Sequence, residues 1–140
     1  MKGLLKQVIQ LFLVPLSALP VIAQEETAPV IQTESGLSYS VIEPGSGPGA
    51  AEGDTVWIFE ITAYRSGHVI YSNMDSNSPI RVVIGAGQAT AGMDEGLRGM
   101  QAGELRKLIL TPDLARRDAY PDNLSPDSSL VITVRLQSIE

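Results

Sequence analysis

The 140-residue sequence contains no cysteine and only one histidine, His68. The absence of cysteine excludes a disulfide, a thiol nucleophile and a cysteine-ligated metal. His68 follows Gly67 in a predicted turn, where a solvated histidine is far more common than a catalytic one. The carboxylates lack metal-ligand spacing, and no phosphate-binding loop or nucleotide fingerprint is present. We therefore expect no metal, no cofactor and no residue that forms a covalent intermediate.

Positive charge is also scarce, with ten basic residues against sixteen acidic ones and a formal net charge of −6. Two of the basic residues, Lys2 and Lys6, lie in residues 1–23, which hold no acidic residue. Eight basic and sixteen acidic residues remain after that segment, a formal charge of −8. This balance excludes nucleic acid as an expected partner.

Only one long apolar run is present, at residues 8–22, and Pro15 and Pro20 interrupt it. The run follows two lysines, is short for a membrane span and ends in Val21-Ile22-Ala23. These features predict a secretory signal peptide at residues 1–23, cut before Gln24. We therefore expect an exported protein, located in a bacterial periplasm, with no stable membrane anchor after cleavage.

The other 117 residues are enough for one domain. Residues 24–35 are polar and aperiodic, which predicts a flexible linker, and the domain spans 36–140. Alternating or β-branched stretches predict antiparallel strands at 37–41, 55–64, 69–71, 80–84, 105–111 and 130–137.

Residues 92–103 carry the one helical pattern. Met93, Leu97 and Met100 share one face at about 100° per residue, and glycines at 92, 96, 99 and 103 form an adjoining stripe. This spacing predicts a helix of about two and a half turns with Gly103 as its C-terminal cap. An interior glycine costs roughly 1 kcal/mol relative to alanine, so we expect the glycine stripe to approach another backbone closely. The simpler alternative is a helix that only packs on a sheet.

These elements predict an α+β domain, with a curved antiparallel sheet of five or six strands packed on one short helix. A sixteen-residue loop, 113–128, separates the last two strands. Loops of this length in compact domains are usually functional or mobile. We predict that this loop, called the flap below, lies over the open end of the sheet.

Several motifs together resemble the FKBP-type peptidyl-prolyl isomerases. They are GDTV at 53–56, SG at 66–67, GMDEGLRGMQAGE at 92–104, TPDLA at 111–115 and PDSSLV at 126–131. The resemblance covers about residues 35–139. It implies an FKBP-like fold and isomerisation of prolyl bonds in exported polypeptide substrates or client proteins. The runner-up interpretation is an inactive FKBP-fold module that binds peptides or acts as a chaperone.

The resemblance also implies a substrate pocket. The positions that match the family's pocket are Glu60, Ile70, Tyr71, Ala89, Thr90, Met93, Arg116 and Ile132, with Tyr120 as a displaced substitute for the flap tyrosine. Nearly every aromatic wall of the family is replaced, so the pocket residues predict weak activity. The Thr90 amide still offers a backbone donor for a substrate carbonyl.

Glu60 places a carboxylate where the family has a phenol, and an unpaired buried carboxylate is costly. We hypothesise that Glu60 pairs with Arg116 across the rim of the pocket; the alternative is that both are solvated. If Glu60 points toward the helix, the alternation of the strand at 55–64 directs Trp57 and Phe59 to the outer face of the sheet. They form either an exposed docking surface or a patch covered by a neighbouring segment.

Overall fold

A computed structural model describes residues 28–140 of the chain. The predicted signal peptide and residues 24–27 of the predicted linker lie outside the described residues. The elements are β1 (Ile31–Gln32), β2 (Ser38–Glu43), β3 (Thr55–Tyr64), β4 (Val69–Ser72), β5 (Ile80–Val83), α1 (Ala91–Leu97), β6 (Leu105–Leu110) and β7 (Leu130–Ile139).

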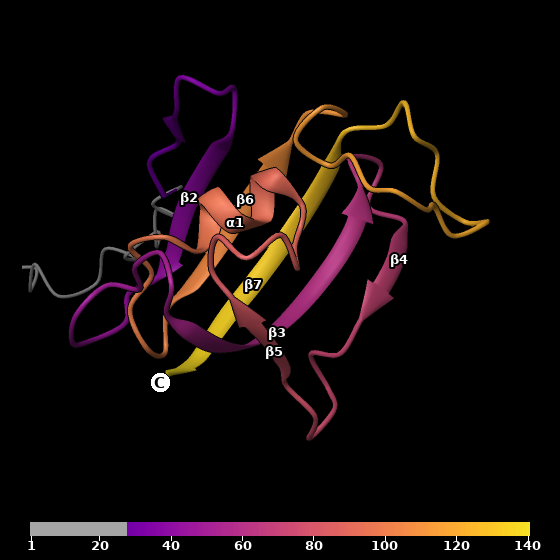
Figure 1. The fold of residues 1–140 in the computed structure, drawn as a ribbon. Helices are drawn as coiled ribbons and strands as arrows, with labels where there is room; N and C mark the ends of the chain where they lie inside the picture. The colour runs from indigo at the N-terminus through magenta and orange to yellow at the C-terminus, as the bar shows by residue number, and fades with distance from the viewer. Residues whose placement is uncertain (1–27) are drawn as a thin grey trace, which may run out of the picture.

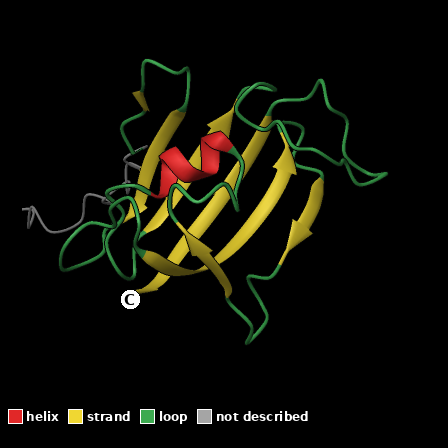
Figure 2. Cartoon of the chain, in the orientation of Figure 1, coloured by secondary structure: helices red, strands yellow, loops and turns green. Residues whose placement is uncertain are grey.

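The strands form one antiparallel sheet in the order β1-β2-β6-β7-β3-β4, and β5 also pairs with β3. The single helix of the described residues lies across the concave face of the sheet (Figures 1 and 2). The predicted α+β fold is confirmed. The short strand β1 lies inside the segment that the sequence assigned to the linker, because Ile31 and Gln32 pair with Tyr39 and Ser38 of β2.

The core lies between α1 and the inner face of the long strands. Period-two alternation in β7 buries Leu130, Ile132, Val134 and Leu136. The buried positions of β6 and β3 lie on the same face of the sheet. The fully buried large side chains of this layer include Ile58, Leu97, Met100, Leu108, Leu110, Leu130 and Leu136. The apolar helix stripe predicted from the sequence faces this core.

Two glycines of α1 bring the helix very close to β6. A Cβ on Gly96 would lie 2.5 Å from Leu108 Cδ1, and one on Gly92 would lie 2.6 Å from Leu110 Cγ. Such distances leave no room for a methyl group. The predicted close approach is therefore real at these two positions, although the partner atoms are leucine side chains of the sheet rather than backbone.

The helix is shorter than predicted. It ends at Leu97, Arg98 is the extended C-cap residue, and Gly99 follows with a φ of 79°. Gly103 is not the helix cap: it has a φ of 85° in the turn that leads into β6. The sequence pattern continued past the true end because Met100 is buried in the core without being helical.

The end of α1 is held by Arg106, a buried arginine on β6. Its Nη1 donates to the carbonyls of Gly96 and Arg98, each at 3.2 Å. Its Nε forms a 2.7 Å ion pair with Glu104, which is also buried. The guanidinium stacks over the Tyr39 ring of β2 at 4.7 Å. One side chain therefore ties three elements together.

Trp57 and Phe59 lie on the outer face of the sheet as the register predicted, and both are partly buried. The Trp57 indole N–H donates to Glu140 at 2.8 Å, so the C-terminal residue covers part of this face. Neither ring belongs to the exposed large apolar side chains, which include Val69 and Tyr71 of β4.

Gly96→Ala tests the close approach of α1 to β6. Overpacking costs about 1–3 kcal/mol, whereas helix propensity gains about 1 kcal/mol. Because Leu108 is fully buried and cannot swing away, we expect a lower free energy of unfolding in urea. Leu108→Ala removes the obstructing atoms, so the double variant should lose less stability than the two single losses added together. Strict additivity would contradict the steric argument.

Arg106→Leu tests the tie between α1 and β6. It leaves Glu104 buried without its partner and two helix carbonyls without a donor, so we expect a loss of about 3–5 kcal/mol. The matched control is Glu43→Gln, which breaks the more exposed Glu43–Arg135 pair and should cost about 1 kcal/mol or less. Equal losses in urea unfolding for the two variants would show that burial of the Arg106 pair is unimportant.

Candidate functional site

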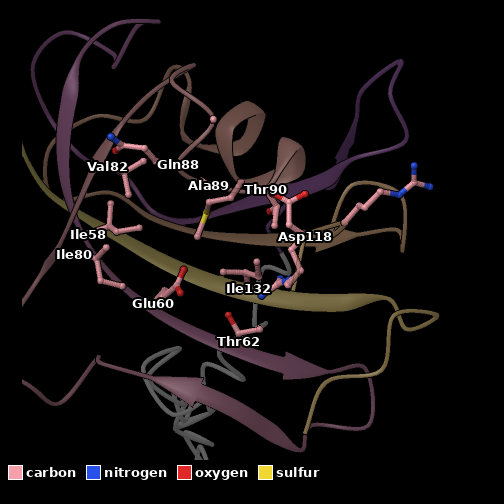
Figure 3. Close-up of a pocket in the computed structure, with 14 residues that line it drawn as sticks. Ile58, Glu60, Thr62, Ile80, Val82, Gln88, Ala89, Thr90, Asp118 and Ile132 are labelled. Carbon is pink, nitrogen blue, oxygen red and sulfur yellow. The ribbon is translucent and has the colours of Figure 1, made fainter. Parts of the chain in front are cut away.

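A pocket of about 520 Å³ lies between α1, the concave face of the sheet and the first part of the flap. Figure 3 shows side chains from both sides of this space. The lining residues are Ile58, Glu60, Thr62, Ile80, Val82, Gly87, Gln88, Ala89, Thr90, Met93, Arg116, Arg117, Asp118 and Ile132. Volumes of this size are typical of sites for small molecules or short peptide segments.

Alternation along the strands produces the apolar part of this lining. Ile58 of β3, Val82 of β5 and Ile132 of β7 face inward because they occupy the buried positions of their strands. Met93, in the first turn of the helix, supplies a thioether from the opposite side. Aliphatic and thioether groups bury area about as effectively as rings do. The pocket therefore has an apolar surface without any aromatic side chain.

Thr90 stands at the N-terminus of α1 with φ −63° and ψ 157°. Its hydroxyl does not cap the helix, and its carbonyl accepts the Asp94 N–H. Within residues 28–140 its own backbone N–H donates no hydrogen bond. Thr90 also lines the pocket, which makes this N–H the candidate backbone donor for a ligand carbonyl.

A gap in the pairing of β3 fixes the position of Glu60. One edge of β3 pairs with β5 up to Ile58 and with β4 from Ile61 onward. Asn73 fills the gap: its Oδ1 accepts the Glu60 N–H at 2.7 Å, and its own N–H donates to the Glu60 carbonyl at 3.1 Å. Asn73 is buried. No sequence pattern drew attention to this residue.

Glu60 projects from β3 toward the helix side of the pocket, between Ile80 and Ile132 (Figure 3). Its side chain is largely buried. Burial raises the pKa of the Glu60 carboxyl above its usual range, and the nearby positive charge of Arg117 counteracts part of this shift. Burial therefore destabilises the ionised form of this carboxylate.

The predicted partner of Glu60 is wrong. Arg116 forms a 2.6 Å ion pair with Asp113, and both side chains are well exposed. Arg117 is the cation that acts on Glu60. Its Nε donates to the Ala115 carbonyl at 3.3 Å, and its Cζ lies 5.9 Å from the Tyr120 ring centre. The flap has no periodicity from which the sequence could have shown which arginine turns inward.

Anchors at both ends hold the flap against the domain. Leu114 accepts the Gly92 N–H at 2.9 Å, so the start of the flap is joined to the start of α1. Near the other end, the Tyr64 hydroxyl donates to the Asn123 carbonyl at 2.8 Å, and Leu124 is buried. The residues between these anchors include Arg116, Arg117 and Asp118, which line the pocket.

The structure brings together six of the nine predicted pocket residues: Glu60, Ala89, Thr90, Met93, Arg116 and Ile132. The other three lie elsewhere. Ile70 packs against the core, Tyr71 is 45% exposed on β4, and Tyr120 lies beside Arg117 without lining the pocket. The predicted set lacked the other eight lining residues: Ile58, Thr62, Ile80, Val82, Gly87, Gln88, Arg117 and Asp118. The alternation of β3 that placed Glu60 inward also implied Ile58 and Thr62.

None of the helices in the described part of the chain is long and apolar enough to cross a membrane. Within residues 28–140, no group of three or more histidine, cysteine, aspartate or glutamate side chains is arranged to hold a metal ion.

The sheet is antiparallel and curves around one short helix, and the pocket lies between them. This arrangement places the protein in the fold class of the prolyl isomerases of FKBP type. The chain belongs to the FKBP-type peptidyl-prolyl cis-trans isomerase family, whose model matches residues 47–137. The matched region contains every residue that lines the pocket.

Named relatives agree with this assignment. A chloroplastic peptidyl-prolyl cis-trans isomerase of Arabidopsis thaliana, FKBP16-3, is 32% identical over 123 residues, which cover 81% of this chain and 53% of the relative. A peptidyl-prolyl cis-trans isomerase of Schizosaccharomyces pombe is 33% identical over 106 residues, covering 74% of this chain and 95% of the relative. The chain thus spans about half the length of the first relative and nearly all of the second.

Solved structures share the fold. FkpA from Escherichia coli matches with a TM-score of 0.70 at 27% identity, covering 79% of this chain and 51% of that protein. AtFKBP13 matches with a TM-score of 0.71 at 22% identity, covering 81% of this chain and all of that protein, which supports the fold alone.

The raised pKa of Glu60 predicts a pH-dependent stability. Between the unfolded-state value of about 4.5 and the raised folded-state value, the folded protein holds a proton that the unfolded chain has lost. The free energy of unfolding should therefore fall as the pH rises through this window. Glu60→Gln removes the carboxyl, so it should be more thermostable than wild type at pH 7, with the advantage shrinking toward pH 4.

Thermal unfolding from pH 4 to pH 8, followed by circular dichroism, measures this difference. Asp75→Asn, which removes an exposed carboxylate outside the pocket, is the control and should follow wild type at every pH. A Glu60→Gln variant whose advantage stays constant with pH would contradict the assignment of the titration to Glu60.

Proposed function

We propose that this protein is a peptidyl-prolyl cis-trans isomerase that assists the folding of exported polypeptides, with lower activity than a pocket walled by aromatic rings would give. The observation that carries the proposal is the combination, in one pocket, of an apolar floor and the unused Thr90 N–H. Membership of the isomerase family supports it. The export part rests on the signal-like sequence of residues 1–23.

The chemistry requires rotation about a partial double bond with a barrier of about 18–20 kcal/mol. The planar amide is more polar than the twisted one, so a site that excludes water favours the twisted form. Met93, Ile58 and Ile132 would surround the proline ring. The Thr90 N–H would hold a substrate carbonyl in place, so that the group on one side of the prolyl bond stays fixed while the group on the other side rotates. Each 1.36 kcal/mol removed from the barrier increases the rate about tenfold.

The alternative function is a peptide-binding or chaperone-like module without isomerase activity. The specific observation in its favour is Glu60, because a carboxylate in the pocket disfavours an apolar ring. The pocket would then hold a polypeptide segment without twisting its amide. Both functions would use the same residues. They are therefore distinguished by the cis–trans exchange rate of a bound peptide and not by its affinity.

The test is the cis–trans exchange rate of short peptides that contain leucine-proline, phenylalanine-proline, lysine-proline and glutamate-proline bonds. We expect the full chain to accelerate exchange in NMR exchange spectroscopy for at least one of these peptides. No acceleration by a protein whose spectrum shows that it is folded would remove the isomerase function and leave the peptide-binding alternative.

Thr90→Pro removes the proposed donor while keeping the backbone angle, because the φ of Thr90 is −63° and proline prefers about −65°. Loss of one hydrogen bond of about 1–1.5 kcal/mol should slow exchange by about fivefold to tenfold. Thr90→Ser keeps the N–H and is the matched control, expected to retain the wild-type rate. Equal rates for the two variants would exclude this N–H from the mechanism.

A further inference from the structure

In the part of the chain that the structure describes, the Glu60 carboxylate has no partner. Among residues 28–140, no ion pair or side-chain hydrogen bond engages its oxygens, and only its backbone is bonded, to Asn73. No fully buried side-chain polar atom in this range lacks a partner. The Glu60 oxygens are therefore not sealed in the core but face the space of the pocket, as Figure 3 shows.

Neither flap arginine supplies the missing contact. Arg116 is paired with Asp113, and Arg117 donates to the Ala115 carbonyl and lies near the Tyr120 ring. Asp118, an exposed residue at the edge of the same pocket, adds a second carboxylate without a side-chain partner in the described residues. Within residues 28–140 both pocket carboxylates therefore lack a side-chain partner, whereas Arg116 is paired with Asp113 and Arg117 donates from Nε to a backbone carbonyl.

The volume of the pocket leaves room for more than a proline ring. About 520 Å³ is within the range of sites that hold drug-sized ligands. A proline ring over Met93 and Ile132 would leave the side of the pocket near Glu60 and Thr62 for the next side chain of the same peptide. Thr62 is buried on the same face of β3 and contributes a hydroxyl there.

We propose that Glu60 is the specificity-determining residue of this pocket and selects peptides with a lysine or arginine immediately before the proline. This inference rests on the proposed function for the position of the proline ring. A cationic side chain would supply the partner that Glu60 lacks, through a charge-assisted hydrogen bond in a partly desolvated site. An apolar side chain would leave the carboxylate unpaired, and an acidic one would add repulsion.

The experiment compares affinities for capped peptides of the form acetyl-Ala-Xaa-Pro-Ala-amide, titrated into the full chain and followed by backbone amide shifts. Lysine and norleucine share the same methylene stem and differ in the charge. We expect the lysine peptide to bind about tenfold more tightly than the norleucine peptide, the ratio for one charge-assisted hydrogen bond. The glutamate peptide should bind most weakly.

Glu60→Gln should bring the lysine and norleucine affinities within about twofold of each other while keeping the folded spectrum. The matched control is Asp122→Asn, which removes an exposed flap carboxylate that does not line the pocket. It should retain the lysine preference. A preference that fell equally in both variants would reflect the acidity of the whole protein and would overturn the proposal.

The outcomes separate this proposal from the proposed function. Lysine-selective binding without accelerated exchange would remove the isomerase activity and keep the selectivity of Glu60. Accelerated exchange with equal lysine and norleucine affinities would keep the isomerase and overturn the selectivity. A folded protein that binds none of the peptides would overturn both.

Discussion

The contact between α1 and β6 is the constraint on which the rest of the molecule depends. Gly92 and Gly96 let the helix lie directly on Leu110 and Leu108, and Arg106 holds the helix end from the same strand. The distance between helix and sheet then fixes the depth of the pocket at the helix N-terminus. A larger residue at either glycine would raise α1 and move Thr90 and Met93 with it.

The same contact explains why the fold could be predicted and the helix end could not. Glycine spacing, the alternation in 130–137 and the turn residues are local signals, and they identified the sheet and the helix position. The end of α1 is held by Arg106, which is ten residues from Gly96 in the sequence and comes within hydrogen-bond distance of it only once β6 is placed. Local periodicity carries no information about a side chain that binds the helix end from another strand. The helix predicted from the sequence was therefore too long and extended to Gly103.

The pocket residues could likewise be predicted where they lie on regular elements but not where they lie in the flap. Glu60, Met93 and Ile132 lie on regular elements, where alternation or helical spacing determines the direction of a side chain. Tyr120 and Arg116 lie in the flap: Tyr120 does not line the pocket, and Arg116 lines it but pairs with Asp113 rather than with Glu60. The choice between Arg116 and Arg117 depends on loop backbone geometry, which has no sequence period. Asn73 was missed because its role exists only where β3 changes partners.

Shape and charge in this pocket have separate origins. Its shape comes from the helix, the sheet and the anchored flap, all of which would survive the loss of the Glu60 carboxyl. Its negative charge comes from Asp118 at the edge and from Glu60, a carboxylate that burial destabilises and that Arg117 only partly compensates. Glu60 therefore lowers the stability of the folded protein, although the contacts around it are satisfied. A ligand that pairs with the carboxylate would offset this cost on binding, which gives the residue a role in recognition rather than in folding.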